Sequence, residues 1–162
     1  MAKKVSYGMK KGQFYSGEFV PKNKMKCINS KNPIYRSSWE QRFMNFCDMN
    51  ENITSWGSET HVIEYFLKLD GKTHRYFTDF YLEMIDKKTK RNKKVLIEVK
   101  PYAQTYWPKQ PKRKTTKSMK NYEEACKTAL KNKAKWEAAD KWAKERGMIF
   151  QVITENEIYG PK

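Results

Sequence analysis

Val95-Leu96-Ile97-Glu98-Val99-Lys100 is a short apolar run that carries two charged side chains of opposite sign. Side chains alternate between the two faces of a β-strand. The two valines and the isoleucine then share one face, whereas Leu96, Glu98 and Lys100 share the other. Charged groups that face inward from so apolar a strand are costly unless they find a partner. The run therefore predicts a strand whose Glu-x-Lys pair meets a divalent metal ion or a phosphate.

A further acid precedes this strand in a segment of similar character. Phe77-Thr78-Asp79-Phe80-Tyr81 places Asp79 inside an aromatic run that predicts another strand. On neighbouring strands, Asp79 and Glu98 offer the hard oxygen ligands that Mg²⁺ prefers, and the main-chain carbonyl of Val99 adds a third. Lys100 is then suited to orient or deprotonate a water molecule and to offset charge on a phosphate. The order D…E-x-K indicates metal-assisted hydrolysis of a phosphodiester.

Each of these residues also has a purely structural interpretation. Asp79 fits an exposed acid on an edge strand, and Glu98 with Lys100 fits an ion pair on a solvated sheet face. Glu64 and Glu83 are competing acids if the register of the strands differs from the one assumed. The presence of Asp79, Glu98 and Lys100 together at this spacing favours the metal site.

Glu40 lies in a segment, residues 37–47, that predicts a helix. Four residues at helical spacing predict the buried stripe of this helix: Trp39, Phe43, Phe46 and Cys47. Ser37 and Glu40 fit a capping box, which is by itself a sufficient reason for an acid here. Glu40 also borders the stripe that faces the sheet, so a second role as a catalytic or metal-binding acid is compatible with capping.

The remaining pattern predicts an α/β fold of the α+β type. Strands are expected over residues 53–56, 61–69, 73–85, 95–100 and 148–154, with Asp70-Gly71 as a hairpin turn. The second, third and fourth of these strands form an antiparallel meander within a mixed central sheet flanked by helices.

A long helix is expected over residues 119–146, with a candidate break near 131–133 and a stop at Gly147. Its buried face is predicted at residues with helical spacing: Tyr122, Cys126, Leu130, Trp136, Ala139, Trp142 and Ala143.

The charge of the chain predicts a polyanionic partner. Lys and Arg outnumber Asp and Glu 34 to 18, for a formal net charge of +16. Such an excess concerns partners rather than folding and favours salt-sensitive binding to nucleic acid. A merely soluble lysine-rich surface and an anionic membrane are the alternatives.

The densest cationic run follows Pro101, in a basic loop expected over residues 102–118. Six cations in and just after it are the candidate nucleic-acid contacts: Lys109, Lys112, Arg113, Lys114, Lys117 and Lys120. Tyr102, Tyr106 and Trp107 are candidate platforms for stacked bases.

The cysteines and the N-terminal segment favour a reducing compartment. Cys27, Cys47 and Cys126 are far apart, so neither a disulfide framework nor a zinc site is expected, and the last two are expected as buried thiols. No apolar leader is visible and no stretch approaches ~18 apolar residues, so a cytoplasmic location without a membrane partner is expected. Residues 1–34 are expected to form a basic arm, followed by one domain over 35–162.

Three runs of the chain resemble one nuclease family. They are Tyr35-Arg-Ser-Ser-Trp-Glu40, Tyr76-Phe-Thr-Asp79-Phe-Tyr and Ile97-Glu98-Val-Lys100-Pro101. Together they resemble the head completion nucleases of T-even-type phages, which are similar to TnsA-type transposon end nucleases within the PD-(D/E)XK superfamily. The resemblance covers roughly residues 35–158, and Thr78 replaces the proline that often precedes the aspartate of the superfamily.

The resemblance implies a restriction-endonuclease-like core with Glu40, Asp79, Glu98 and Lys100 at the active-site positions. It implies a Mg²⁺-dependent endonuclease, for which Mn²⁺ can substitute, and exonuclease activity is a further option. It also implies action on packaged DNA during head completion and head–tail joining, beside phage head or neck proteins. The expected location is then the cytoplasm of the infected host cell or the virion.

Two other function classes stay open at this point. One is a non-catalytic, nucleic-acid-binding structural protein of the virion. The other is a resolvase or transposon-type end nuclease on the same fold, which symmetric dimerisation and a preference for branched substrates would reveal. The oligomeric state is not determined by the sequence.

Overall fold

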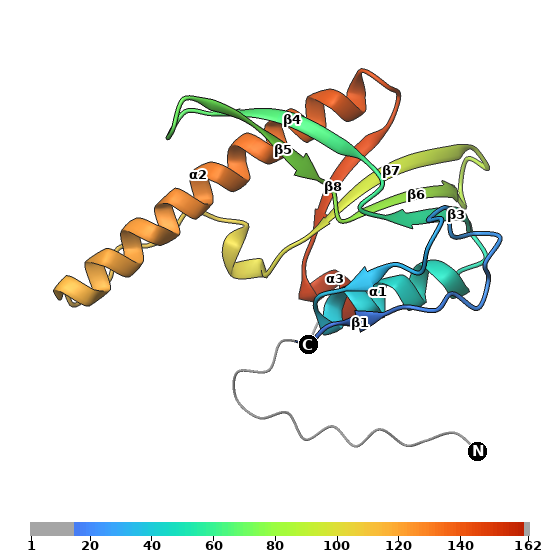
Figure 1. Ribbon diagram of the computed structural model, residues 1–162, viewed down its shortest axis with the longest axis horizontal. Coiled ribbons are helices and arrows are strands. Elements are labelled where there is room, and N and C mark those ends of the chain that lie inside the picture. Colours follow the sequence, from blue (N-terminus) through green and yellow to red (C-terminus); the bar gives the residue numbers. More distant parts are fainter. Residues whose placement is uncertain (1–14, 161–162) are drawn as a thin grey trace, which may run out of the picture.

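A four-stranded sheet in the order β3-β6-β7-β8 organises the protein (Figure 1). The computed structural model describes residues 15–160. Strands β3 (Ile53–Ser58), β6 (Phe80–Ile85) and β7 (Asn92–Val99) are antiparallel neighbours, and β8 (Ile149–Ile153) is parallel to β7. The mixed central sheet and the α+β class are therefore confirmed.

The hairpin of β4 (Val62–Leu67) and β5 (Lys72–Phe77) forms a separate two-stranded ribbon. The predicted strand over 73–85 is consequently wrong, and so is the three-stranded meander. The chain leaves the ribbon at Thr78 and Asp79 and enters the central sheet at Phe80. No glycine or proline marks this break, and aromatic residues on both sides of it make the two strands look like one.

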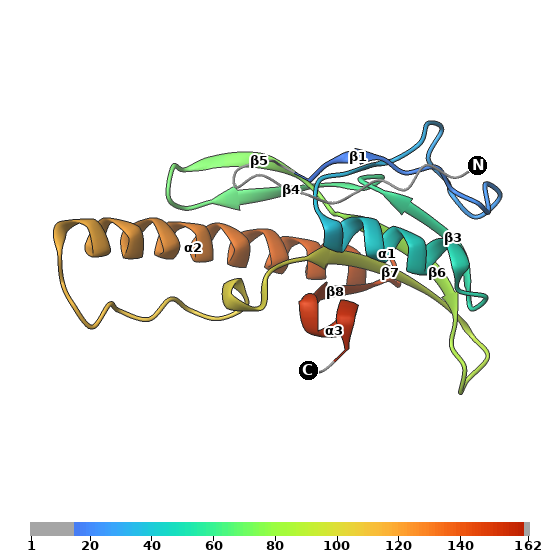
Figure 2. The same cartoon turned by 90° about the horizontal axis from the view of Figure 1, so that it is seen from below.

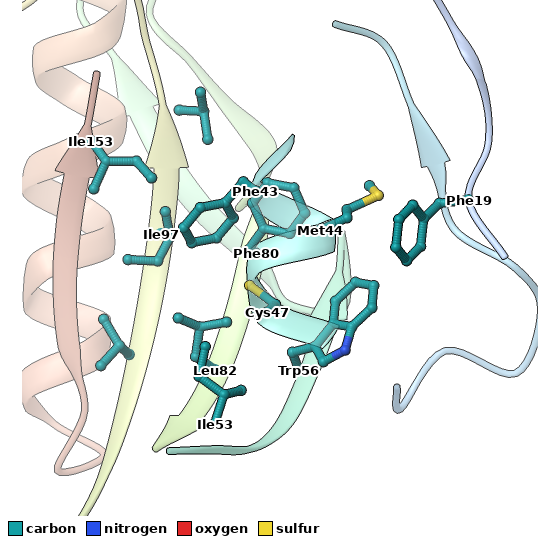
Figure 3. Packing of buried hydrophobic residues seen from close by; sticks show 12 residues of the cluster. Phe19, Phe43, Met44, Cys47, Ile53, Trp56, Phe80, Leu82, Ile97 and Ile153 are labelled. Carbon is teal, nitrogen blue, oxygen red and sulfur yellow. The ribbon is translucent and has the colours of Figure 1, made fainter. Parts of the chain in front are cut away.

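Helix α1 (Ser38–Met49) covers one face of the central sheet (Figure 3). Phe43, Met44 and Cys47 are buried in the same cluster as Val95, Ile97 and Val99 of β7, as the alternation along β7 predicts. Phe46 was expected in this stripe but is 52% exposed. The buried stripe of the helix is displaced from the predicted one, because Met44 is buried together with Phe43 and Cys47.

Helix α2 (Thr116–Lys144) is continuous, so the candidate break near 131–133 is absent. Its C-terminal half covers the second face of the sheet, where Ala139 and Ala143 are buried with Leu96. Its N-terminal half extends past the sheet beside the ribbon (Figures 1 and 2).

The buried face predicted for α2 is wrong in its N-terminal half. Leu130 is 39% exposed, and Tyr122 and Cys126 are only partly buried. No sheet lies beneath this part of the helix, so its apolar side chains have less surface to pack against.

The described part of the predicted N-terminal arm packs on the domain. Strand β1 (Gly17–Glu18) pairs with β2 (Ile34–Tyr35), and the ring centroid of Phe19 lies 5.7 Å from that of Trp56 in the core. Residues 1–14 of the arm lie outside the described residues, and its boundary with the domain stays a prediction.

Two short elements complete the fold, η1 (Tyr102–Gln104) after β7 and α3 (Glu155–Tyr159) after β8. Within residues 15–160, no helix is both long and apolar enough to cross a membrane.

Candidate active site

The C-terminal end of β7 brings three of the predicted site residues together. Glu98 is 1% exposed, and its Oε1 lies 2.9 Å from Nζ of Lys100. Asp79 lies in the bend between β5 and β6, where its Oδ2 accepts a hydrogen bond from the Val99 amide at 2.7 Å. The prediction that Asp79 is a strand residue is therefore wrong. The bend nevertheless holds its carboxylate against the strand that leads through Glu98 to Lys100.

The Asp79 carboxylate lies in a setting that disfavours negative charge. Burial and the charge of Glu98 raise the pKa of Asp79 to about 8, although the Val99 amide and Lys100 oppose this. Burial lowers the pKa of Lys100, but the charge and hydrogen bond of Glu98 outweigh burial and leave that pKa above its usual value. The buried Glu98 and the partly buried Asp79 lie close together and provide a place where another cation is favourable.

The donor set fits a hard divalent cation. For such an ion, Asp79 and Glu98 would supply carboxylate oxygens, and Val99 between Glu98 and Lys100 would supply a main-chain carbonyl. Among residues 15–160, no three acidic, histidine or cysteine side chains gather closely enough to form a complete metal cage. Mg²⁺ commonly takes only one or two protein carboxylates and fills its other positions with water and substrate oxygens. Two carboxylates therefore suffice for this ion.

Glu40 caps the first turn of α1. Its Oε2 accepts a hydrogen bond from the Arg36 amide at 2.7 Å, and its Oε1 accepts one from the Ser37 hydroxyl at 3.1 Å. The Glu40 amide in turn donates to the Ser37 hydroxyl at 3.1 Å, which is one half of the predicted capping box. The other half differs from the prediction, because the Glu40 carboxylate accepts from the amide of Arg36 rather than from that of Ser37. Capping alone is therefore a sufficient structural reason for this acid.

Glu40 also lines a cleft of about 170 Å³ together with Asp79. The ion pair between Arg36 and Glu59, with an N–O distance of 2.5 Å, forms another part of its lining. Glu40 thus shares a cleft with Asp79 while its carboxylate oxygens are engaged in capping.

The two competing acids lie elsewhere. Glu64 is an exposed residue of β4. Glu83 lies toward the far end of β6, where its Oε1 is 3.6 Å from Nζ of Lys94. The structure therefore groups Asp79, rather than either alternative, with Glu98 and Lys100.

Tyr76 contacts Glu98 and was not among the site residues predicted from the sequence. It is buried on β5, and its hydroxyl donates a 2.6 Å hydrogen bond to Oε2 of Glu98. Burial and the charge of Glu98 raise the pKa of Tyr76, so its hydroxyl remains a donor at neutral pH. Glu98 is held from two sides, by Tyr76 and by Lys100. Tyr76 begins one of the runs that resemble the nuclease family, but its contact with Glu98 could not be predicted, because it depends on how the ribbon packs in the fold.

We expect Tyr76→Phe to slow DNA cleavage about tenfold, because groups that orient a metal-binding acid contribute about that much. The buried Glu98 oxygen also loses its donor, which costs about 1–3 kcal/mol of unfolding free energy. Cleavage kinetics and urea unfolding measure both effects. Tyr65→Phe is the matched control, since Tyr65 is buried in the same cluster. Equal effects of the two substitutions would contradict a role for the Tyr76 hydroxyl.

The six candidate nucleic-acid contacts lie along the loop after η1 and the start of α2. All six are exposed, and none forms an ion pair with a carboxylate of the described chain: Lys109, Lys112, Arg113, Lys114, Lys117 and Lys120. Beside them Tyr102, Tyr106 and Trp107 are about half exposed. The loop therefore presents cations and aromatic rings that are accessible to a polyanion.

Two comparisons with known proteins cover most of the chain. Residues 50–155 match the family described as TnsA-like endonuclease N terminal. The head completion nuclease of Enterobacteria phage T4 is 39% identical over 143 residues, which are 88% of this chain and 92% of that protein. The family match includes Asp79, Glu98 and Lys100 but begins after Glu40.

Proposed function

The chain belongs to the TnsA-like endonuclease family, and we propose that it is a phage nuclease that cleaves DNA with a divalent metal ion. The observation that carries this proposal is the buried Glu98, which is paired with Lys100 and lies beside Asp79. A protein that only binds nucleic acid has no need of a buried glutamate that is paired with a lysine and lies close to a second, partly buried acid.

The proposed roles follow from the chemistry of each group. Asp79, Glu98 and the Val99 carbonyl would hold Mg²⁺, and Glu40 is a candidate further acid on the side of the cleft. When bound, such an ion polarises the scissile phosphate and lowers the pKa of an attacking water. The Lys100 ammonium orients that water and offsets charge that develops on the phosphate. We propose endonuclease action first and exonuclease action as a secondary activity.

The relative in phage T4 supports a biological setting for this activity. That protein is named a head completion nuclease, and the similarity spans 92% of it. We propose that this chain likewise acts on packaged DNA during head completion and head–tail joining, with phage head or neck proteins as partners. It would then be found in the cytoplasm of the infected cell or in the virion.

Cleavage of supercoiled plasmid and end-labelled linear DNA tests the proposal. We expect cutting with Mg²⁺ or Mn²⁺ and none in EDTA. Lys100→Ala is expected to lower the rate at least about 100-fold, because it removes charge stabilisation next to the phosphate. Lys94→Ala is the matched control on the same strand, and it should leave cleavage unchanged. Tight binding without any product, whichever metal is present, would instead indicate a structural DNA-binding protein.

The basic loop should provide a large part of the DNA affinity. Replacing Lys112, Arg113 and Lys114 together by glutamine is expected to reduce the slope of log K against log salt by about 2–3, since each phosphate contact contributes about 0.9. Fluorescence anisotropy in EDTA at several salt concentrations measures this slope. Replacing three exposed lysines of the β6–β7 turn, Lys87, Lys88 and Lys90, removes the same charge. An equal loss of slope in both variants would mean that the loop has no special role.

A further inference from the structure

Lys135 of α2 lies beside the active site without belonging to the D…E-x-K pattern. Its Nζ is 5.0 Å from the centroid of the Tyr76 ring, and the hydroxyl of Tyr76 donates to Glu98. Tyr76 therefore contacts Glu98 through its hydroxyl and Lys135 through its ring. The side chain of Lys135 thus approaches the site from α2, which begins at Thr116, well after the end of β7 at Val99.

Lys135 is half-buried, whereas the other lysines of α2 are exposed, and it has no acidic partner within residues 15–160. Lys127, Lys133 and Lys144 each pair with a carboxylate one turn away on the helix. Within residues 15–160, no carboxylate lies at ion-pair distance from Lys135, although the residue is half-buried. An ammonium that is partly removed from water is costly when no anion is nearby. The aromatic face of Tyr76 offsets part of this cost through a cation–π interaction.

The electrostatic surroundings connect Lys135 to the catalytic residues. Burial lowers the pKa of Lys135, the charges of Glu98 and Asp79 raise it, and those of Lys100 and Lys131 lower it. The ammonium is thus within electrostatic reach of both acids and of Lys100, but none of them is its direct partner. A phosphate of a bound strand would supply the missing anion.

We propose that Lys135 is a substrate-binding residue of this site and that its ammonium contacts a phosphate oxygen of the DNA at or next to the scissile bond. The inference rests on the proposed nuclease function. Lys100 on β7 and Lys135 on α2 then approach the substrate backbone from two different elements. Tyr76 links substrate binding to the positioning of Glu98, because its ring contacts the ammonium of Lys135 and its hydroxyl donates a hydrogen bond to Glu98.

Lys135→Met tests this, since methionine keeps much of the apolar stem but removes the charge. We expect the slope of log K against log salt for DNA binding in EDTA to fall by about 0.9, the value of one phosphate contact. We also expect kcat for cleavage to fall at least about tenfold, as charge stabilisation in the transition state is lost. Lys135→Arg should restore most of the binding slope. Thermal melting should show no loss of stability in Lys135→Met, because the half-buried cation has no carboxylate partner.

Lys133→Met is the matched control on the same helix, where Lys133 is exposed and its Nζ is 3.8 Å from Glu137. If the wild type cleaves DNA and the two variants behave alike in slope and kcat, the inference is overturned and the proposed function stands. A lower melting temperature of Lys135→Met with an unchanged binding slope would assign Lys135 a structural role and also overturn it. If the wild type cleaves nothing, the proposed function fails, and the binding slope still decides whether Lys135 contacts phosphate.

Discussion

Asp79→Asn is expected to lower DNA cleavage at least about 100-fold and to make the metal-free protein more stable. The loss of activity follows because the substitution removes a charged oxygen ligand where a metal ion would be held. DNA affinity should change little, since the exposed cations of the basic loop lie on other elements. Cleavage rates with Mg²⁺ and anisotropy in EDTA measure the two quantities separately. Full activity of Asp79→Asn would remove Asp79 from the site.

The gain in stability follows from the raised pKa of Asp79. The pKa of Asp79 is about 8 in the folded protein, above the usual value of 3.8, so the folded state favours the protonated carboxyl. The stability that this protonation contributes is complete below pH 3.8 and is lost as the pH rises through 8. Asparagine can still accept the hydrogen bond of the Val99 amide without carrying charge. Urea unfolding in EDTA should therefore show Asp79→Asn to be more stable than the wild type at pH 9, by a difference on the order of 1–3 kcal/mol that shrinks toward pH 4.

Asp140→Asn is the control for this pH dependence. Asp140 lies on α2 away from the site, and its Oδ2 is 2.6 Å from Nζ of Lys144 at the surface. This variant should gain no stability at high pH and should cleave DNA normally. The explanation by buried charge fails if Asp79→Asn and Asp140→Asn shift stability in the same way across this pH range.

Leu96→Ala is expected to reduce the unfolding free energy by about 2–5 kcal/mol, the range typical of a leucine removed from a packed core. Leu96 is 0% exposed and lies between the central sheet and α2 with Ala139 and Ala143. The small alanines bring the helix close to the sheet, so few neighbouring atoms can move into the space left behind. Urea or guanidinium unfolding gives the difference.

Leu130→Ala is the matched substitution on α2. It tests whether the N-terminal half of this helix is packed more loosely than its C-terminal half. Leu130 is 39% exposed because it lies in the half that passes beyond the sheet. We expect its replacement to change stability by less than about 1 kcal/mol. Similar losses at Leu96 and Leu130 would mean that the N-terminal half of α2 is packed as tightly as the C-terminal half.

Features with a local periodicity could be predicted from the sequence. The alternation along β7 separates Val95 and Ile97 from Leu96 and Glu98, and the structure buries these pairs on opposite sides of the sheet. The N-cap of α1 at Ser37, whose hydroxyl accepts from the Glu40 amide, is also local, because both residues belong to one helical turn. Strand pleating and helix termini act over a few residues, so their signals survive without knowledge of the fold.

The break between β5 and β6 could not be predicted in the same way. Thr78 and Asp79 interrupt an aromatic run without glycine or proline, and the chain changes sheets there. The reason for the break is tertiary: the Asp79 carboxylate accepts a hydrogen bond from Val99, 20 residues later. The Thr78 amide also donates to the His61 carbonyl, and the Asp79 carbonyl accepts from the Glu59 amide, so contacts with distant residues fix this bend.

The residue types of the candidate site, an aspartate followed by Glu-x-Lys, could be identified from the sequence, as could the strand face shared by the glutamate and the lysine. The positions of Tyr76 and Lys135 beside them depend on the tertiary structure. These two residues come from the ribbon and from α2, which approach Glu98 because apolar side chains pack them against the same face of the sheet. Side-chain periodicity describes one element at a time, whereas the packing of three elements against one another sets which residues surround a buried acid.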